Sequence, residues 1–133
     1  MFQAKLMVWI TVFVFVIYGA LFVVSPGVMF ERVTGSELLS RSALIDVRAT
    51  YGGLSVAVGL VLARLALNAD TLRTAVMASM WLAALMGLTR AMGFLVDQNP
   101  SDTMVFYLGA EVVFTLWGGL ILRKLRTRRY YFK

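Results

Sequence analysis

Four long apolar segments constrain this chain more than any other feature of the sequence. They cover about residues 6–24, 43–67, 72–96 and 103–122, and each is long enough to cross the hydrocarbon core of a bilayer as a helix. No water satisfies backbone polar groups in that core, so open strands and irregular segments do not span it. The sequence therefore predicts an all-α fold: a four-transmembrane-helix bundle that forms a single membrane domain over residues 1–133.

The composition agrees with a membrane protein and restricts its chemistry. Sixty per cent of the 133 residues are hydrophobic, whereas soluble domains have about 45–50%. The chain has no cysteine and no histidine, which excludes disulfides, thiol catalysis, iron–sulfur clusters and histidine-ligated haem. The eight methionines are scattered without a clustered motif, a pattern typical of packing. We therefore expect no metal site and no cofactor.

Two local features leave alternatives open. Pro26 can begin a short helix that Gly35 would end, and such a helix would lie flat in the headgroup layer; a plain loop is the alternative. The pair Gly52-Gly53 in the second segment favours close helix packing, since small residues let backbones approach in lipid. A local kink in the second segment is the other interpretation of this pair.

The basic residues gather at one end of the predicted bundle. Lys5, the turn between Arg64 and Arg73, and six basic residues in the tail 123–133 lie on the side of the two termini. The opposite side has fewer basic residues and more acidic ones. The excess of Lys and Arg predicts that both termini are cytoplasmic in a multi-pass protein of the bacterial inner membrane. Because the basic tail directly follows an apolar span, it indicates topology, and we expect no nucleic-acid partner.

Apart from Arg64 and Arg73 at the ends of their segments, four charged residues fall within the apolar segments, where a charge costs roughly 3 kcal/mol by insertion scales. Asp46 and Arg48 lie near the outer end of the second segment, and Arg90 and Glu111 lie in the third and fourth. Although helix directions alternate, all four reach the same half of the bilayer, and their formal charges sum to zero. This placement predicts a shared polar site near the outer surface.

Helical phase predicts which side chains meet there. Arg48 and Tyr51 share one face of the second helix, and Tyr107 and Glu111 share one face of the fourth. Arg90 adjoins a stripe of small residues on the third helix. We expect these five side chains to point inward among the last three helices. The first helix, apolar and aromatic, is expected to need no polar partner.

Three hypotheses explain this cluster. The first is a polar site in the outer leaflet that binds a lipid headgroup or a small polar ligand, because arginine and tyrosine hold such groups by several donors. The second is a purely structural or accessory role in which intramembrane ion pairs pin the bundle. The third is a membrane isomerase that moves protons between carboxylates and tyrosine. The candidate polar cluster comprises Asp46, Arg48, Tyr51, Arg90, Asp97, Tyr107 and Glu111.

The enzyme hypothesis has the least support in the sequence. No nucleophile motif, phosphate-binding loop or metal-ligand spacing is present, so no residue is assigned a catalytic role. The partners expected of this chain are membrane lipids. A homo-oligomer or a second protein in the membrane is left open.

The stretch Arg48-Ala49-Thr50-Tyr51-Gly52-Gly53, followed in order by Arg90, Asp97 and Glu111, carries a family resemblance. The sequence resembles a family of small bacterial four-helix membrane proteins of unknown function, which is distantly similar to DoxX/DoxD-like bundles. The resemblance implies the four-helix fold and points to the same charged residues, and it implies no activity. In that pattern a glycine precedes the arginine and follows the aspartate, whereas this chain has Thr89 and Gln98.

Overall fold

The computed structural model describes residues 1–98 and 100–130, and within them every regular element is a helix. The predicted all-α fold is confirmed, and four helical segments are long and apolar enough to cross a membrane. Three of them are α1 (Phe2–Val24), α5 (Leu72–Val96) and α6 (Asp102–Tyr130). The fourth runs without a break from Arg41 to Ala66. The chain is therefore a small multi-pass membrane protein.

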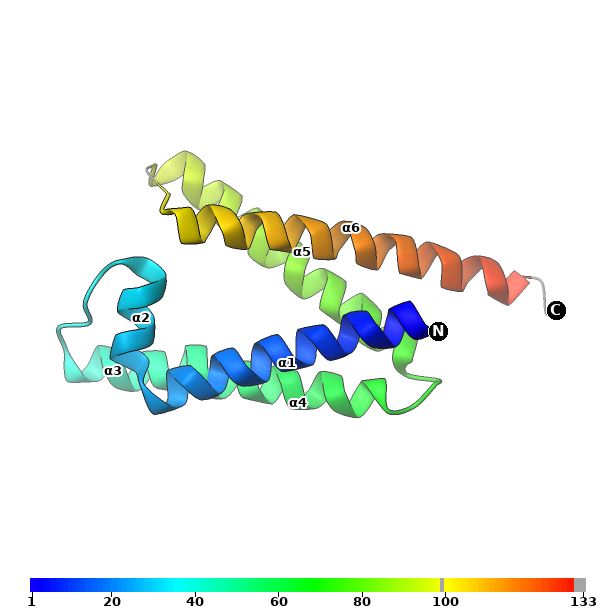
Figure 1. Ribbon diagram of the computed structural model, residues 1–133, viewed down its shortest axis with the longest axis horizontal. Helices are drawn as coiled ribbons and strands as arrows, with labels where there is room; N and C mark the ends of the chain where they lie inside the picture. The colour runs from blue at the N-terminus through cyan, green and yellow to red at the C-terminus, as the bar shows by residue number, and fades with distance from the viewer. Residues whose placement is uncertain (99, 131–133) are drawn as a thin grey trace.

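The short helix after the first span is present as α2 (Pro26–Thr34). Proline stands at its first turn, where no hydrogen bond from its nitrogen is needed. Gly35 ends the helix in a left-handed conformation, with φ of 76°, which glycine adopts without the penalty that a Cβ would bring. The helix contacts both α1 and α6, so it fills the end of the bundle opposite the termini (Figure 1). We call this end of the bundle the α2 end.

The second span consists of three helical pieces: α3 (Arg41–Val47), the π-helical turn η1 (Arg48–Gly53) and α4 (Leu54–Ala66). Ser40 caps its start, since its hydroxyl oxygen accepts a hydrogen bond from the Ala43 backbone N–H at 3.0 Å. The π turn coincides with the Arg-Ala-Thr-Tyr-Gly-Gly stretch. Such turns are rare and occur mostly as local irregularities inside α-helices, frequently at functional sites.

The two glycines of η1 have different surroundings. A Cβ on Gly52 would lie 2.7 Å from Val23 Cγ2 and 2.9 Å from the Val23 nitrogen, whereas a Cβ on Gly53 would meet nothing within 4 Å. Gly19 of α1 faces the same crossing, where a Cβ would lie 2.8 Å from the Gly52 carbonyl oxygen. The close-packing interpretation therefore applies to Gly52, and the local irregularity is the π turn itself.

The four long helices form two pairs. α1 packs along α4, and α5 packs along α6, as Figure 1 shows. At the end that carries both termini, which we call the termini end, all four helices contribute to one apolar core. Its buried members are Ala4, Met7, Val8, Val12, Leu62, Ala66, Leu72, Ala75, Val76 and Ile121. From there α1 and α6 diverge toward the α2 end (Figure 1).

The outward faces of the long helices are strongly apolar. Leu95 is 82% exposed and Phe106 72% exposed, and many other large hydrophobic side chains share this exposure. Soluble monomers rarely expose apolar surface of such extent. In a bilayer these side chains contact lipid tails, which agrees with the spans found by length and hydropathy.

Candidate functional site

Arg90 of α5 and Glu111 of α6 form an ion pair inside the membrane-spanning region. The Arg90 Nη2 atom lies 2.8 Å from Glu111 Oε1, and the Arg90 Nε atom donates to both carboxylate oxygens at 3.2 and 3.0 Å. The side chains are only 19% and 10% exposed. A planar guanidinium that meets a carboxylate through two nitrogens gives a charge-assisted pair with defined geometry.

Gly87 makes room for this pair on α5. A Cβ at Gly87 would lie 3.2 Å from Glu111 Cβ and 3.6 Å from Glu111 Oε2. At this position the predicted stripe of small residues on α5 therefore provides space for a side chain of α6. It lets α6 approach α5 closely enough for Glu111 to reach Arg90, one helical turn further along.

Two residues of the first half of α6 complete the surroundings of Arg90. Its Nη1 atom donates to the sulfur of Met104 at 3.0 Å, and its guanidinium carbon lies 5.3 Å from the centre of the Tyr107 ring. A cation within about 6 Å of an aromatic centre is attracted by the ring quadrupole. Arg90, Tyr107 and Glu111, which the sequence placed together, therefore do meet.

Tyr18 of α1 belongs to the same site. It interacts electrostatically with Tyr107, Tyr51 and Arg90, and its ring lies 4.8 Å from that of Phe22. Tyr18 was not among the residues expected at this site. One signal in the sequence could have found this residue: Tyr18 is the only tyrosine of the first span, and a buried tyrosine hydroxyl usually needs a partner.

Tyr51 of η1 extends the aromatic side of the site. Its ring stacks on Phe22 with centres 5.3 Å apart and an interplanar angle of 28°. Tyr51 itself is exposed. Among the described residues, none of the hydroxyl groups of Tyr18, Tyr51 and Tyr107 has a hydrogen-bond partner. These hydroxyls are therefore free to bind another molecule.

Arg48 has a different position from that expected. It is exposed, and its Nη1 atom donates to the backbone oxygen of Val23. That carbonyl belongs to the last turn of α1, where four carbonyls lack a partner within the helix. A cation at this position also interacts favourably with the helix dipole. Arg48 thus caps α1 from the neighbouring span.

The two aspartates of the predicted cluster lie outside the Arg90–Glu111 pair. Asp46 and Asp97 are both exposed, and neither forms an ion pair with any residue that the structure describes. The structure therefore brings together Arg90, Glu111, Tyr107 and Tyr18, with Tyr51 at the edge. It leaves Asp46, Arg48 and Asp97 at the surface of the α2 end.

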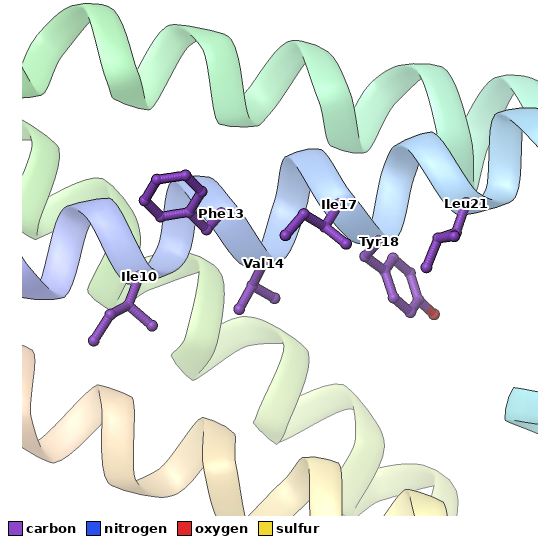
Figure 2. Close-up of a pocket in the computed structure, with 6 residues that line it drawn as sticks. All are labelled: Ile10, Phe13, Val14, Ile17, Tyr18 and Leu21. Atoms are coloured by element: carbon purple, nitrogen blue, oxygen red, sulfur yellow. The ribbon is translucent and has the colours of Figure 1, made fainter.

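An apolar groove runs along α1 and leads to Tyr18 (Figure 2). The groove has a volume of about 390 Å³. Ile10, Val14 and Tyr18 point from α1 away from α4, toward the side of α5 and α6. The groove is lined by Ile10, Phe13, Val14, Ile17, Tyr18 and Leu21. Tyr18 is the only polar residue of the lining, and it is the residue of the lining that interacts electrostatically with Arg90.

A second groove, between α4 and α5, offers a contrast. Its lining includes Leu54, Val61, Trp81 and Met86, and it contains no tyrosine and no charged side chain. Within the described residues, no three His, Cys, Asp or Glu side chains gather where they could hold a metal ion.

Comparison with known families now places the chain. A model for a domain of unknown function, DUF4345, matches residues 3–122. The chain belongs to the DUF4345 family. The match covers nearly all of the four spans of this DUF4345 protein, including the whole Arg90–Glu111 site. Comparison with curated proteins and with solved structures gives no significant match. The distant similarity to DoxX/DoxD-like bundles therefore stays a prediction.

Proposed function

We propose that this DUF4345 protein binds the polar part of a lipid or of a small polar molecule in the outer leaflet of the bacterial inner membrane. The observation that carries the proposal is the hydrogen bonding of Arg90. A guanidinium has five N–H groups, and three of those on Arg90 are directed to Glu111 and Met104. Two have no acceptor among the described residues, and hydrocarbon offers none.

The tyrosine hydroxyls add to this donor surplus. Tyr18 and Tyr107 lie close enough to interact electrostatically with Arg90. Both side chains are partly buried, yet neither hydroxyl is bonded within the described residues. The transfer of an unpaired polar group from water to an apolar medium costs roughly 2–7 kcal/mol of free energy. A bound molecule with acceptor atoms, or water that enters from the surface, satisfies them.

The experiment is a comparison of two conservative substitutions. Arg90→Lys keeps a cation opposite Glu111 but removes the planar fork of donors. Arg73→Lys, at an exposed position near the termini end, is the matched control. Both variants and the wild type are extracted from membranes in polymer discs, and the co-purifying molecules are measured by native mass spectrometry. We expect at least tenfold lower occupancy of one lipid-like or polar species in Arg90→Lys alone.

Two outcomes would count against the proposal. Equal occupancy in Arg90→Lys and wild type would show that the retained molecule does not contact Arg90. If no molecule is retained by any of the three proteins, the ion pair has a structural role only.

The structural role is the second candidate, and one observation favours it. Both oxygens of Glu111 accept hydrogen bonds from Arg90, so the carboxylate is well satisfied without a ligand. The pair links α5 to α6 near the α2 end, where α1 and α6 have diverged. In this case the pair would fix the register of two helices, as buried polar groups do in some bundles.

The orientation is also a proposal. Basic residues at the termini end include Lys5, Arg64, Arg73, Arg123, Lys124 and Arg126, and the excess favours cytoplasmic termini. The test is a pair of fusions after Lys133, one to a reporter that is active only in the cytoplasm and one to a reporter that is active only in the periplasm. We expect activity from the cytoplasmic reporter alone. Activity from the periplasmic reporter would reverse the orientation and move the site to the inner leaflet.

A further inference from the structure

The Arg90 site is electrically neutral as a unit. The groups that interact electrostatically with Arg90 are Glu111, Tyr18 and Tyr107, and the formal charges of these four side chains sum to zero. The other charges of the α2 end, such as Asp46 and Arg48, are exposed and not bonded to the pair. A neutral site with surplus N–H and O–H donors suits an uncharged acceptor better than an anion, because an anion would also meet the repulsion of Glu111.

The depth of the site points to the same kind of group. Tyr18 and Arg90 each lie six residues before the end of their helices at the α2 end, which is about 9 Å at 1.5 Å per residue. The 25 residues of α5 span roughly 37 Å, whereas the hydrocarbon core is about 30 Å thick. With α5 centred in the core, Arg90 lies about 5 Å inside the hydrocarbon boundary, and the same calculation for the 23 residues of α1 places Tyr18 about 7 Å inside it.

Lipid chemistry places few polar groups at this level. In a glycerolipid the ester carbonyls are the polar atoms next to the acyl chains, and the phosphate and headgroup lie further out. An ester carbonyl is an uncharged acceptor. It matches the donors of Arg90 and Tyr18 in charge, and it is the polar group of a glycerolipid that lies nearest to their depth.

The groove on α1 has the dimensions of one lipid tail. From Leu21 to Ile10 it covers eleven helical steps, about 16 Å along the axis, which is close to half of a hydrocarbon core of about 30 Å. It is apolar except for Tyr18, which stands near its end toward the α2 end. An acyl chain laid along it would place its ester group beside the Tyr18 hydroxyl.

From these observations we infer that the occupant is a glycerolipid that is recognised by its ester linkage and not by its headgroup. The ester carbonyl accepts hydrogen bonds from the unused N–H groups of Arg90 and from the Tyr18 hydroxyl, and one acyl chain lies along α1. The headgroup extends past the α2 end and makes no selective contact. This inference rests on the proposed function and names the ligand class of the same site.

The test compares three lipids of equal chain length: diester phosphatidylcholine, diester phosphatidylglycerol and diether phosphatidylcholine. Delipidated protein is titrated with each lipid, and occupancy is read by native mass spectrometry. We expect the two diester lipids to bind within twofold of each other, although only one is anionic. The diether lipid, which lacks the carbonyl, should bind at least tenfold more weakly.

Two variants test whether the preference for ester over ether lipids arises at this site. Tyr18→Phe keeps the ring that packs on Phe22 and removes only the hydroxyl, so it should reduce the preference for ester over ether at least threefold. Thr89→Val is the matched control, since the Thr89 hydroxyl is exposed and already donates to its own helix at Leu85. It should leave the preference unchanged.

The possible failures are distinguishable. Tenfold tighter binding of phosphatidylglycerol than of phosphatidylcholine would show that the site selects lipids by the charge of the headgroup. This result would overturn the inference of ester recognition, while the proposed function would stand. Equal binding of ester and ether lipids, or a preference that Tyr18→Phe leaves intact, would also overturn it. If none of the three lipids binds and no other molecule co-purifies with the wild type, the proposed function fails as well.

Discussion

The two ends of the bundle are built from the same four helices, yet they are held together differently. At the termini end, residues such as Met7, Val8 and Val76 are fully buried, and every long helix contributes to the core. At the α2 end, α1 and α6 diverge and α2 fills the space beside them. There the contacts between helices include an ion pair, stacked aromatic rings and an arginine cap.

The difference shows how a small membrane protein can combine stability with a site. In lipid, helix association depends on close packing and on hydrogen bonds between helices. The termini end uses the packing of apolar side chains. The α2 end uses directional polar contacts, which fix geometry, while some donor groups of Arg90 and the tyrosines have no partner in the part of the chain that the structure describes. Four substitutions test this division, in order of decreasing expected effect.

The largest effect is expected from Glu111→Gln, which leaves Arg90 without its counter-ion. Removing one partner of a buried pair costs about 3–5 kcal/mol in soluble proteins, so the melting temperature in detergent should fall strongly. The double variant Arg90→Gln/Glu111→Gln should recover part of the loss, because two amides can bond each other. Additive losses in the double variant would mean that the pair does not stabilise the α2 end.

Gly52→Ala should have the next largest effect. Its Cβ would overlap the Val23 nitrogen and Cγ2 atoms, both closer than 3.0 Å, so η1 and α1 must move apart. Overpacking of this kind costs about 1–3 kcal/mol. Gly53→Ala is the matched control, since its Cβ meets nothing within 4 Å. Thermal unfolding should separate the two variants, and equal melting temperatures would contradict the close crossing of these helices.

Gly118→Ala applies the same test to the termini end. Its Cβ would lie 2.8 Å from Met80 Cβ and 2.9 Å from Met7 Cε. The end of the Met7 side chain can move aside, but Met80 Cβ is fixed to its helix, so we expect a loss of about 1–2 kcal/mol, in the lower part of the range for overpacking. Gly119→Ala, which meets nothing within 4 Å, is the control. If Gly118→Ala lost more stability than Gly52→Ala, the expected order of the two effects would be wrong.

The smallest effect is expected from Arg48→Met, which removes the cap on the Val23 carbonyl. Favourable charges at helix termini contribute about 0.3–1 kcal/mol at exposed sites. Arg48→Lys should retain most of this contribution because it keeps a cation. Both variants should retain the bound lipid that Arg90→Lys loses. Loss of that lipid in Arg48→Met would show that Arg48 belongs to the binding site, as the sequence predicted.

Much of the fold follows from the sequence because its physical causes are local. Four apolar segments of sufficient length predict the spans, Pro26 and Gly35 predict the ends of α2, and charges inside apolar segments are rare enough to mark a site. Helical phase and the alternation of helix directions were sufficient to predict that Arg90 and Glu111 lie near each other. These arguments need only residue type and spacing along one helix.

The tertiary structure alone decided which polar groups share a site. The phase of Arg48 relative to the residues that follow depends on the π turn η1, whose extra residue per turn rotates all later side chains relative to earlier ones. The pair Gly52-Gly53 allows a local irregularity but does not specify this one. The place of Tyr18 depends on where α1 crosses the second span, which is set by the contact of Gly19 with Gly52. Both are properties of helix packing, since they depend on atoms far apart in the chain. For this reason the sequence predicted the ion pair and missed the tyrosine beside it.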